Sequence, residues 1–200
     1  MKNIIFDLGG VVLDWNPVKV RKEFTSNPEL PRFLFESGFF QEHWTEFDRG
    51  TYTEEEMIGK MSALSGFPLS DCREFMEYIK HSLVDIPRTV ELIRRLSEKG
   101  FPLYCLSNMS HEFYDYLKDR EVFRYFDGQI ISAREGMVKP DEDIFNLLLD
   151  RFGLKPHECL FVDDLSANVK TAAELGFHTV LFADKEKGYR AIDRFIADKS

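Results

Sequence analysis

The chain has 200 residues, of which 44% are hydrophobic and 30% charged, and its formal net charge at pH 7 is −9. This length suits one sizeable core, or a core domain that carries a smaller inserted domain, and argues against three domains. The acidic balance without a basic stripe argues against nucleic-acid binding, and the lack of an apolar run of about eighteen residues argues against a membrane protein.

The start of the chain and its cysteines indicate a cytoplasmic protein. The apolar start is interrupted by Asp7 and two glycines, and the small-residue cleavage pattern of a signal peptide does not follow. Cys72, Cys105 and Cys159 are odd in number and widely spaced, so we expect buried free thiols rather than disulfides or a zinc site. The choice between monomer and homodimer stays open.

The first predicted strand ends in an acid. Residues 3–6 (Asn-Ile-Ile-Phe) suit a strand buried on both faces of a parallel sheet, and Asp7, Leu8, Gly9 and Gly10 follow it. Ligands of open α/β sheets bind outside the carboxyl ends of the strands, so Asp7 is a candidate nucleophile or metal ligand. The alternative is an Asp that only begins a turn.

The next seventy residues favour helices without an intervening strand. Helical patterns occur at residues 17–24, 31–40, 43–47, 53–64 and 70–83. We therefore expect a helical cap domain at residues 15–86, inserted into a catalytic core formed by residues 1–14 and 87–200. Within this cap, Arg49 precedes Gly50 in a helix-breaking loop that carries a cation, and the simplest interpretation from the residues alone is a solvated Arg beside a C-capping Gly.

From residue 87 the pattern alternates between helix and strand. Helices are predicted at residues 89–99, 112–118, 141–152 and 165–175, strands at 102–106, 128–132, 159–162 and 179–182, and a loop at 134–140. These units predict the α/β class: a Rossmann-like parallel sheet with helices on both faces, plus the inserted cap. The last few residues are expected to fray.

Polar residues follow the predicted strands at one edge of the sheet. They are Asp7, the pair Ser107 and Asn108, and the pair Asp163 and Asp164, with Lys139 on a nearby loop. Carboxylates hold an oxygen-loving divalent cation, whereas Lys, hydroxyl and amide groups hold phosphate oxygens, so the set indicates phosphoryl transfer. Helix caps and an exposed Lys are the alternatives for the single members.

Four segments resemble, in order and type, the four motifs of the haloacid dehalogenase superfamily. They are residues 6–11 (Phe-Asp-Leu-Gly-Gly-Val), 106–108 (Leu-Ser-Asn), 138–140 (Val-Lys-Pro) and 161–164 (Phe-Val-Asp-Asp) with Asn168. The resemblance covers nearly the whole chain. The Asp-Leu-Gly start and the Arg49-Gly50 loop are most similar to the sugar-phosphate phosphatase branch, which includes α-glucose-1-phosphate phosphatases.

The resemblance implies a magnesium-dependent phosphatase that acts on a small phosphorylated metabolite, such as a sugar phosphate. Asp7 would be the nucleophile that forms an aspartyl-phosphate. Mg²⁺ would be held by Asp7, the backbone carbonyl of Gly9 and Asp164, with Asp163 supporting them.

The resemblance also implies how the substrate would be held. Ser107, the amide of Asn108 and Lys139 would bind the phosphoryl oxygens, with Lys139 also counted among the catalytic groups. Arg49 would reach the substrate from the cap.

The chain departs from this family at Gly9. Phosphatases of the family usually have an Asp there, which protonates the leaving group and then activates water, and such catalysis is worth ~10²–10⁴-fold. His43, Asp14 and Asp48 are candidate substitutes that the sequence cannot rank.

Two alternative functions follow from this departure. A metal-free haloacid dehalogenase would need no such acid, although adjacent Asp163 and Asp164 would then repel each other at a strand end. A non-catalytic phosphate-binding or interaction module would keep the pocket without turnover.

Overall fold

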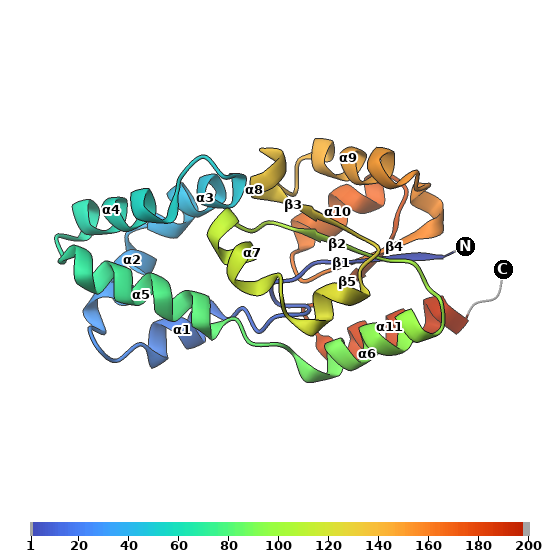
Figure 1. The fold of residues 1–200 in the computed structure, drawn as a ribbon, viewed down its shortest axis with the longest axis horizontal. Coiled ribbons are helices and arrows are strands. Elements are labelled where there is room, and N and C mark those ends of the chain that lie inside the picture. Colours follow the sequence, from blue (N-terminus) through green and yellow to red (C-terminus); the bar gives the residue numbers. More distant parts are fainter. Residues whose placement is uncertain (1, 198–200) are drawn as a thin grey trace.

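The computed structural model describes residues 2–197, and its centre is one sheet of five parallel strands (Figure 1). The strands are β1 (Asn3–Phe6), β2 (Leu103–Ser107), β3 (Gly128–Ile131), β4 (Cys159–Asp163) and β5 (His178–Leu181), in the order β3-β2-β1-β4-β5. Along the chain, β2 and β3 are therefore added on one side of β1, and β4 and β5 are then added on its other side. Such a reversal of strand order opens a crevice at the carboxyl ends of the central strands. The predicted α/β class with a parallel sheet is confirmed.

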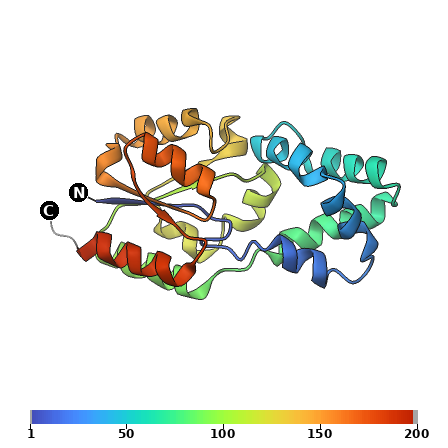
Figure 2. The same ribbon diagram turned by 180° about the vertical axis from the view of Figure 1, so that it is seen from behind.

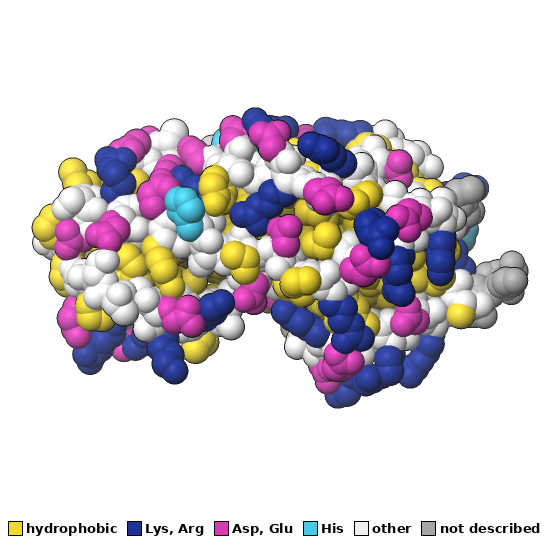
Figure 3. Space-filling model, turned by 60° about the horizontal axis from the view of Figure 1, so that its bottom comes forward, with side chains coloured by type: hydrophobic (Ala, Val, Ile, Leu, Met, Phe, Trp, Pro, Cys, Tyr) yellow, Lys and Arg dark blue, Asp and Glu magenta, His cyan; other side chains and the backbone are white. Residues whose placement is uncertain are grey.

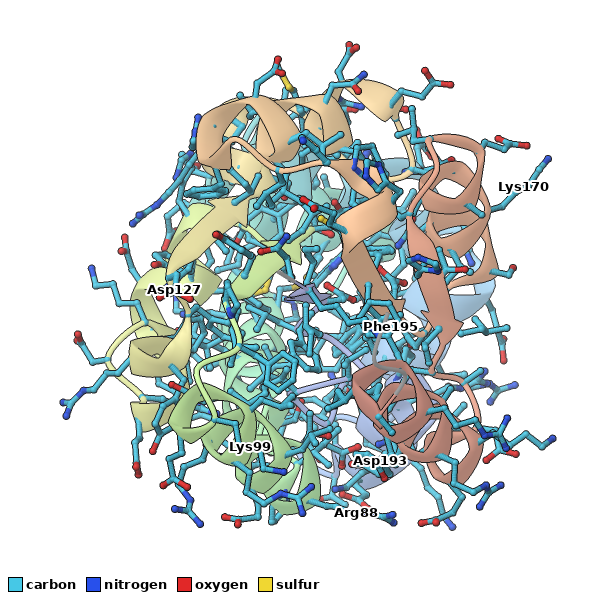
Figure 4. The ribbon with its side chains drawn as sticks, turned by 90° about the vertical axis from the view of Figure 1, so that its right-hand side faces the viewer. Arg88, Lys99, Asp127, Lys170, Asp193 and Phe195 are labelled. Carbon is cyan, nitrogen blue, oxygen red and sulfur yellow. The ribbon has the colours of Figure 1, made fainter. Side chains whose placement is uncertain are left out.

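Helices cover both faces of the sheet. Helices α6 (Pro87–Glu98) and α11 (Lys185–Ala197) lie on one face, and α9 (Glu142–Phe152) and α10 (Ser166–Glu174) lie on the other. Figure 4 shows this arrangement from the end, with Arg88 of α6 and Asp193 of α11 on one side and Lys170 of α10 on the opposite side. The hydroxyls of Thr89 and Tyr189 form a buried hydrogen bond of 2.7 Å that joins α6 to α11.

The strands send alternate residues into two hydrophobic clusters. Ile5, Leu106 and Phe161 belong to the cluster beneath α9 and α10, whereas Ile4 and Phe6 belong to the cluster on the other face. All five are fully buried, as expected of strands covered on both faces. The second cluster continues from the sheet into the helices of the inserted segment.

The inserted segment forms a helical lobe beside the sheet (Figures 1 and 2). Its elements are α1 (Pro17–Glu23), α2 (Glu29–Glu36), the π-helix η1 (Phe40–Trp44), α3 (Thr45–Arg49), α4 (Glu54–Ser65) and α5 (Leu69–Ser82). Residues 15–86 are described throughout and contain no β-strand, as predicted. Figure 3 shows an indented outline where this lobe meets the rest of the molecule.

Two connecting segments join the lobe to the sheet and run side by side. The amide of Asp14 donates to the carbonyl of Val84 at 2.7 Å, and the amide of Ile86 donates to the carbonyl of Val12 at 2.8 Å. Both passages of the chain thus lie at one place beside the end of β1.

Several elements differ from the sequence-based predictions. The helix expected at residues 31–40 ends at Glu36, because Gly38 takes a left-handed backbone with φ +82°. A short helix, α8 (Ser132–Glu135), occupies the start of the expected loop at 134–140. Helix α7 (His111–Leu117) follows β2 as expected. A short 3₁₀ helix, η2 (Glu121–Tyr125), follows α7, and another, η3 (Pro156–Glu158), lies between α9 and β4.

The sequence analysis assigned no element to α11. This helix contains Gly188, which lowers helix propensity, yet a Cβ at Gly188 would lie 2.3 Å from the ring of Phe182. Tertiary packing therefore requires the residue that local propensity disfavours. The expected fraying of the last few residues falls mainly on positions 198–200, outside the described residues. Among residues 2–197, no helix has both the length and the apolar composition needed to cross a bilayer.

The turn after β1 depends on Gly10 rather than on Gly9. Gly10 has φ +72°, and a Cβ there would lie 2.3 Å from Oδ2 of Asp164. Gly9 is not among the residues of positive φ, and its Cβ would lie at an ordinary 3.6 Å from Cβ of Trp15. The backbone conformation and the nearness of Asp164 therefore require a glycine at position 10 but not at position 9.

We predict that Gly10→Ala lowers the free energy of unfolding by about 1–2 kcal/mol or more, because the new methyl group adds a clash with Asp164 to the cost of a left-handed backbone. Gly9→Ala is the matched control and should change it by less than about 1 kcal/mol. Urea denaturation of both variants tests this. Equal losses would contradict the assignment of the strained position to Gly10.

Candidate active site

Asp7 lies at the centre of the candidate site because it directly follows the central strand. Its amide donates to the carbonyl of Val162 on β4 at 2.9 Å, which extends the parallel pairing by one residue. Its side chain is buried, with the residue 7% exposed. The acid thus lies at the carboxyl end of β1, with β2 and β4 on its two sides.

Lys139 is the buried cation of the site. Its Nζ lies 2.9 Å from Oδ1 of Asp7 and 2.6 Å from Oδ2 of Asp163, and it donates to the carbonyl of Leu106 at 2.9 Å. Burial disfavours the charged ammonium, but the two carboxylates outweigh this effect and raise the pKa of Lys139 above its usual value. The alternative of an exposed Lys is wrong, since the residue is 3% exposed.

Asn108 fixes the backbone of Lys139. Its Oδ1 accepts from the Lys139 amide at 2.8 Å, and its Nδ2 donates to the Lys139 carbonyl at 2.9 Å. The sequence analysis gave Asn108 a role through its backbone amide only. The side chain adds a second one, because it ties the end of β2 to the loop that carries the cation.

Asp163 is fully buried and its oxygens are engaged by protein groups. Oδ1 accepts from the Leu165 amide at 2.8 Å, and Asn168 Nδ2 lies 3.1 Å from Oδ1 and 3.0 Å from Oδ2. Together with the contact to Lys139, these bonds orient the carboxylate. The place of Asp163 beside a metal ion stays a prediction.

The carboxylates suit a divalent cation. Oxygens of Asp7, Asp163 and Asp164 lie within 4.8 Å of one another. Burial raises the pKa of Asp7 to about 7, with Lys139 opposing and Asp163 adding to the rise, and burial followed by the charge of Asp163 raises the pKa of Asp164 to about 6. A cation of charge +2 would offset this repulsion, and an all-oxygen donor set fits Mg²⁺.

Ser107 offers an unpartnered hydroxyl beside this charge network. The residue ends β2, is 1% exposed, and its Oγ has no hydrogen-bond partner among residues 2–197. Buried hydroxyls are nearly always paired, so such a group indicates a position that a ligand oxygen would satisfy. Ser107 directly follows Leu106, whose carbonyl binds Lys139.

Arg49 lies where the helical lobe meets the loop before α9. Its Nε is 3.3 Å from Oε1 of Glu46, its Nη2 is 3.6 Å from Oδ2 of Asp141, and its Nη1 donates to the Gly136 carbonyl at 3.5 Å. The side chain is 31% exposed. Gly50 is the C-capping Gly that the sequence analysis expected, while Arg49 has protein contacts and is partly exposed. Its contact with substrate stays a prediction.

Two further features lie near the site, of which the sequence analysis named only the second. The indole rings of Trp15 and Trp44 stack with centroids 6.0 Å apart, and Trp15 would be in ordinary contact with a Cβ at position 9. Asp48, near the end of α3, is one of the three candidate acids named from the sequence. It interacts electrostatically with Asp7 and Lys139, and burial followed by the charge of Asp7 raises the pKa of Asp48 to about 8.

We predict that Asp7→Asn stabilises the protein in the presence of a chelator above pH 7, by about 1–4 kcal/mol. The folded protein holds the Asp7 proton up to about pH 7 and the unfolded chain only up to about pH 4, so this carboxyl lowers stability as the pH rises between these values. The gain should therefore shrink from pH 8 to pH 5 and vanish near pH 4.

Urea denaturation at several pH values measures this gain, with the exposed Asp150→Asn as the matched control. A variant that is destabilised equally at pH 8 and pH 5 would contradict the account of surplus buried charge.

The sequence of this chain is similar to those of several known proteins. Residues 1–176 match the haloacid dehalogenase-like hydrolase family. A sesquiterpene phosphatase of Aspergillus oryzae is 28% identical over 88% of this chain and 86% of its own length. A D-ribitol-5-phosphate phosphatase of Bacteroides thetaiotaomicron is 29% identical over 90% of each chain.

A solved structure also matches. An enzyme of this family from Bacteroides thetaiotaomicron, solved as a magnesium complex, has 25% identity and a TM-score of 0.73, over 90% of this chain and 92% of that chain. Some relatives are longer, and this chain spans 38% of the bifunctional epoxide hydrolase 2 of Sus scrofa. The family match covers most of the chain and includes every strand tip of the site, so the protein belongs to the haloacid dehalogenase-like hydrolases.

Proposed function

We propose that the protein is a magnesium-dependent phosphatase that acts on a small phosphorylated metabolite through an aspartyl-phosphate on Asp7. The observation that carries this proposal is the buried network in which Lys139 binds both Asp7 and Asp163 beside the unpartnered hydroxyl of Ser107. An anionic group that enters here would meet a cation, a hydroxyl donor and a nucleophilic carboxylate together. That combination suits a phosphoryl group.

The residues of the site divide the chemistry between them. Lys139 and Ser107 would bind phosphoryl oxygens, together with the backbone amide of Asn108, while Asp7 attacks phosphorus and displaces the leaving group. Mg²⁺, held by Asp7, Asp164 and the Gly9 carbonyl with Asp163 beside them, would offset negative charge on the carboxylates and on the phosphate. Lys139 favours the ionised, nucleophilic form of Asp7, which burial alone would suppress.

The substrate class rests on the lobe and on the relatives. We place residues 15–86 as a cap domain that covers the site, and its Trp44 stacks on Trp15 next to Gly9. Flat aromatic faces suit the apolar face of a sugar ring or another small carbon skeleton. The D-ribitol-5-phosphate phosphatase relative supports a sugar phosphate, and the sesquiterpene phosphatase relative makes an apolar phosphate the second substrate to screen.

The metal-free dehalogenase is the second candidate function, and Gly9 favours it because attack on carbon needs no acid at that position. The adjacent acids Asp163 and Asp164 count against it, because burial followed by the charge of Asp163 disfavours the ionised form of Asp164 when a cation is absent. A phosphate-binding module without turnover is the third candidate function.

Three free buried cysteines, Cys72, Cys105 and Cys159, support a reducing compartment such as the cytoplasm.

We predict phosphate release from sugar phosphates that stops in chelator and returns with added Mg²⁺. Asp7→Asn should lower turnover by at least about 10³-fold, because the nucleophile is removed while Lys139 keeps its bonds to Asp163 and Leu106. A colorimetric phosphate assay measures both effects. Full phosphate release in chelator would contradict the magnesium dependence. Halide release from 2-haloacids without phosphate release would favour the dehalogenase, and binding of phosphate without turnover would favour the module.

We predict that Arg49→Ala raises KM for the preferred substrate by roughly tenfold or more, because a charge-assisted contact at the edge of the lobe is lost. The small generic substrate acetyl phosphate should be affected much less. Steady-state kinetics on both substrates distinguish the roles. Equal effects would limit Arg49 to its structural contacts with Glu46 and Asp141.

A further inference from the structure

The site lacks a side chain at Gly9, where relatives of this fold would hold the acid that protonates the leaving group. A Cβ at position 9 would lie in ordinary contact with Trp15, at 3.6 Å from its Cβ, so the turn would accept a side chain that the sequence does not supply. A proton donor for the leaving group would have to come from another element. The three candidates named from the sequence, Asp14, His43 and Asp48, can now be compared by position.

Asp48 is held against the phosphate-binding edge of the sheet by hydrogen bonds. The hydroxyl of Ser132, the first residue of α8, donates to the backbone carbonyl of Asp48 at 2.5 Å. The same hydroxyl accepts from the amide of Met109 at 2.8 Å, and Met109 directly follows Asn108. The buried Ser132 thus connects the turn that carries Asp48 to the loop that follows Ser107.

The turn that carries Asp48 is pressed closely onto the core. Gly50 ends α3 with φ +82°, and a Cβ there would lie 2.7 Å from the Ala133 carbonyl and 3.0 Å from Nε2 of His111. Figure 1 shows α3 beside α8 at the boundary of the two lobes. The backbone position of Asp48 is therefore set by the bond to its own carbonyl and by the packing of Gly50 two residues later.

The carboxyl group of Asp48 belongs to the charge network of the site. It interacts electrostatically with Asp7 on β1 and with Lys139 on the loop before α9. Its partly buried setting and the charge of Asp7 raise the pKa of Asp48, which favours its protonated form. A protonated carboxyl near the nucleophile is what general acid catalysis requires.

The other two candidates are engaged elsewhere. Oδ2 of Asp14 forms an ion pair with Nζ of Lys19 at 3.4 Å, with a third of its side chain exposed. The ring of His43 packs edge-on against Phe39 at 4.9 Å, and its Nε2 lies 3.9 Å from Oε1 of Glu42.

We propose that Asp48, supplied by the cap, is the general acid and base that replaces the missing side chain at Gly9. This inference rests on the proposed phosphatase function. In the first step the bond from Asp7 Oδ to phosphorus forms, the bond from phosphorus to the leaving oxygen breaks, and the Asp48 proton moves to that oxygen. In the second step the Asp48 carboxylate takes a proton from water as the water oxygen attacks phosphorus, which releases phosphate and frees the Asp7 carboxylate.

The test is a series of phosphate esters with graded leaving groups, from p-nitrophenyl to alkyl, measured in single turnover with Mg²⁺. The wild type and the matched control Asp14→Asn should show a shallow dependence on the leaving-group pKa. Asp48→Asn should lose about 10²–10⁴-fold on alkyl phosphates and much less in phosphorylation by p-nitrophenyl phosphate. Acid quenching and mass spectrometry should then show phosphorylated Asp7 accumulating in this variant, because its hydrolysis lacks the base.

Installing a carboxyl at position 9 gives an independent measurement. Gly9→Asp combined with Asp48→Asn should restore the shallow dependence, since Gly9 has neither positive φ nor a close contact at Cβ. Gly9→Asp alone should give at most a severalfold gain on alkyl phosphates if Asp48 already supplies the proton. A gain of 10²-fold or more would overturn the proposal even if Asp48→Asn failed to fold.

The remaining outcomes separate the two proposals. An Asp48→Asn variant with the wild-type dependence on leaving group would overturn the role of Asp48 and leave the phosphatase intact. A wild type without phosphatase activity on any ester of the series would overturn both.

Discussion

The buried contact of Lys139 with Asp7 and Asp163 is the interaction on which the rest of the site depends. Charges out of water are costly unless they are paired and hydrogen-bonded, and here one ammonium meets two carboxylates and a carbonyl. The pairing leaves negative charge in excess once Asp164 is included. A divalent cation beside the carboxylates would offset this excess charge.

The sheet topology explains why these groups meet although they are far apart in the chain. Strand β1 lies between β2 and β4, with Phe6 paired to Cys105 on one side and to Val162 on the other. Each strand then ends in a polar residue at the same edge: Asp7, Ser107 and Asp163. Parallel pairing alone brings these tips together, and Asn108 brings in Lys139 by holding its backbone through two hydrogen bonds.

The strand tips could be predicted because strand ends and polar residues are local signals in the sequence. Asp7, Ser107 and Asp163 each follow a short apolar run, and parallel sheets align such ends by necessity. Helix α11 was missed because its Gly188 disfavours a helix locally, whereas contact with Phe182 decides its place. The sequence also could not show that Asp48 is better placed than Asp14 or His43, since the position of Asp48 depends on a bond from Ser132, 84 residues later in the chain.

A proton donor in the cap would change what cap movement does in this protein. A donor beside Asp7 on β1 would be present whether the cap were open or docked. Asp48 instead belongs to α3, and contacts of α3 with the core, among them the bond from Ser132 of α8, place it near Asp7. Docking of the cap would then exclude water and complete the acid in one event, so that a phosphoryl group bound to an open site meets the nucleophile without a proton for its leaving group. Substrates that hold the cap closed would then receive the proton from Asp48. The hydrolysis rate of small phosphates that leave the cap open would instead depend on how readily their leaving group departs without a proton.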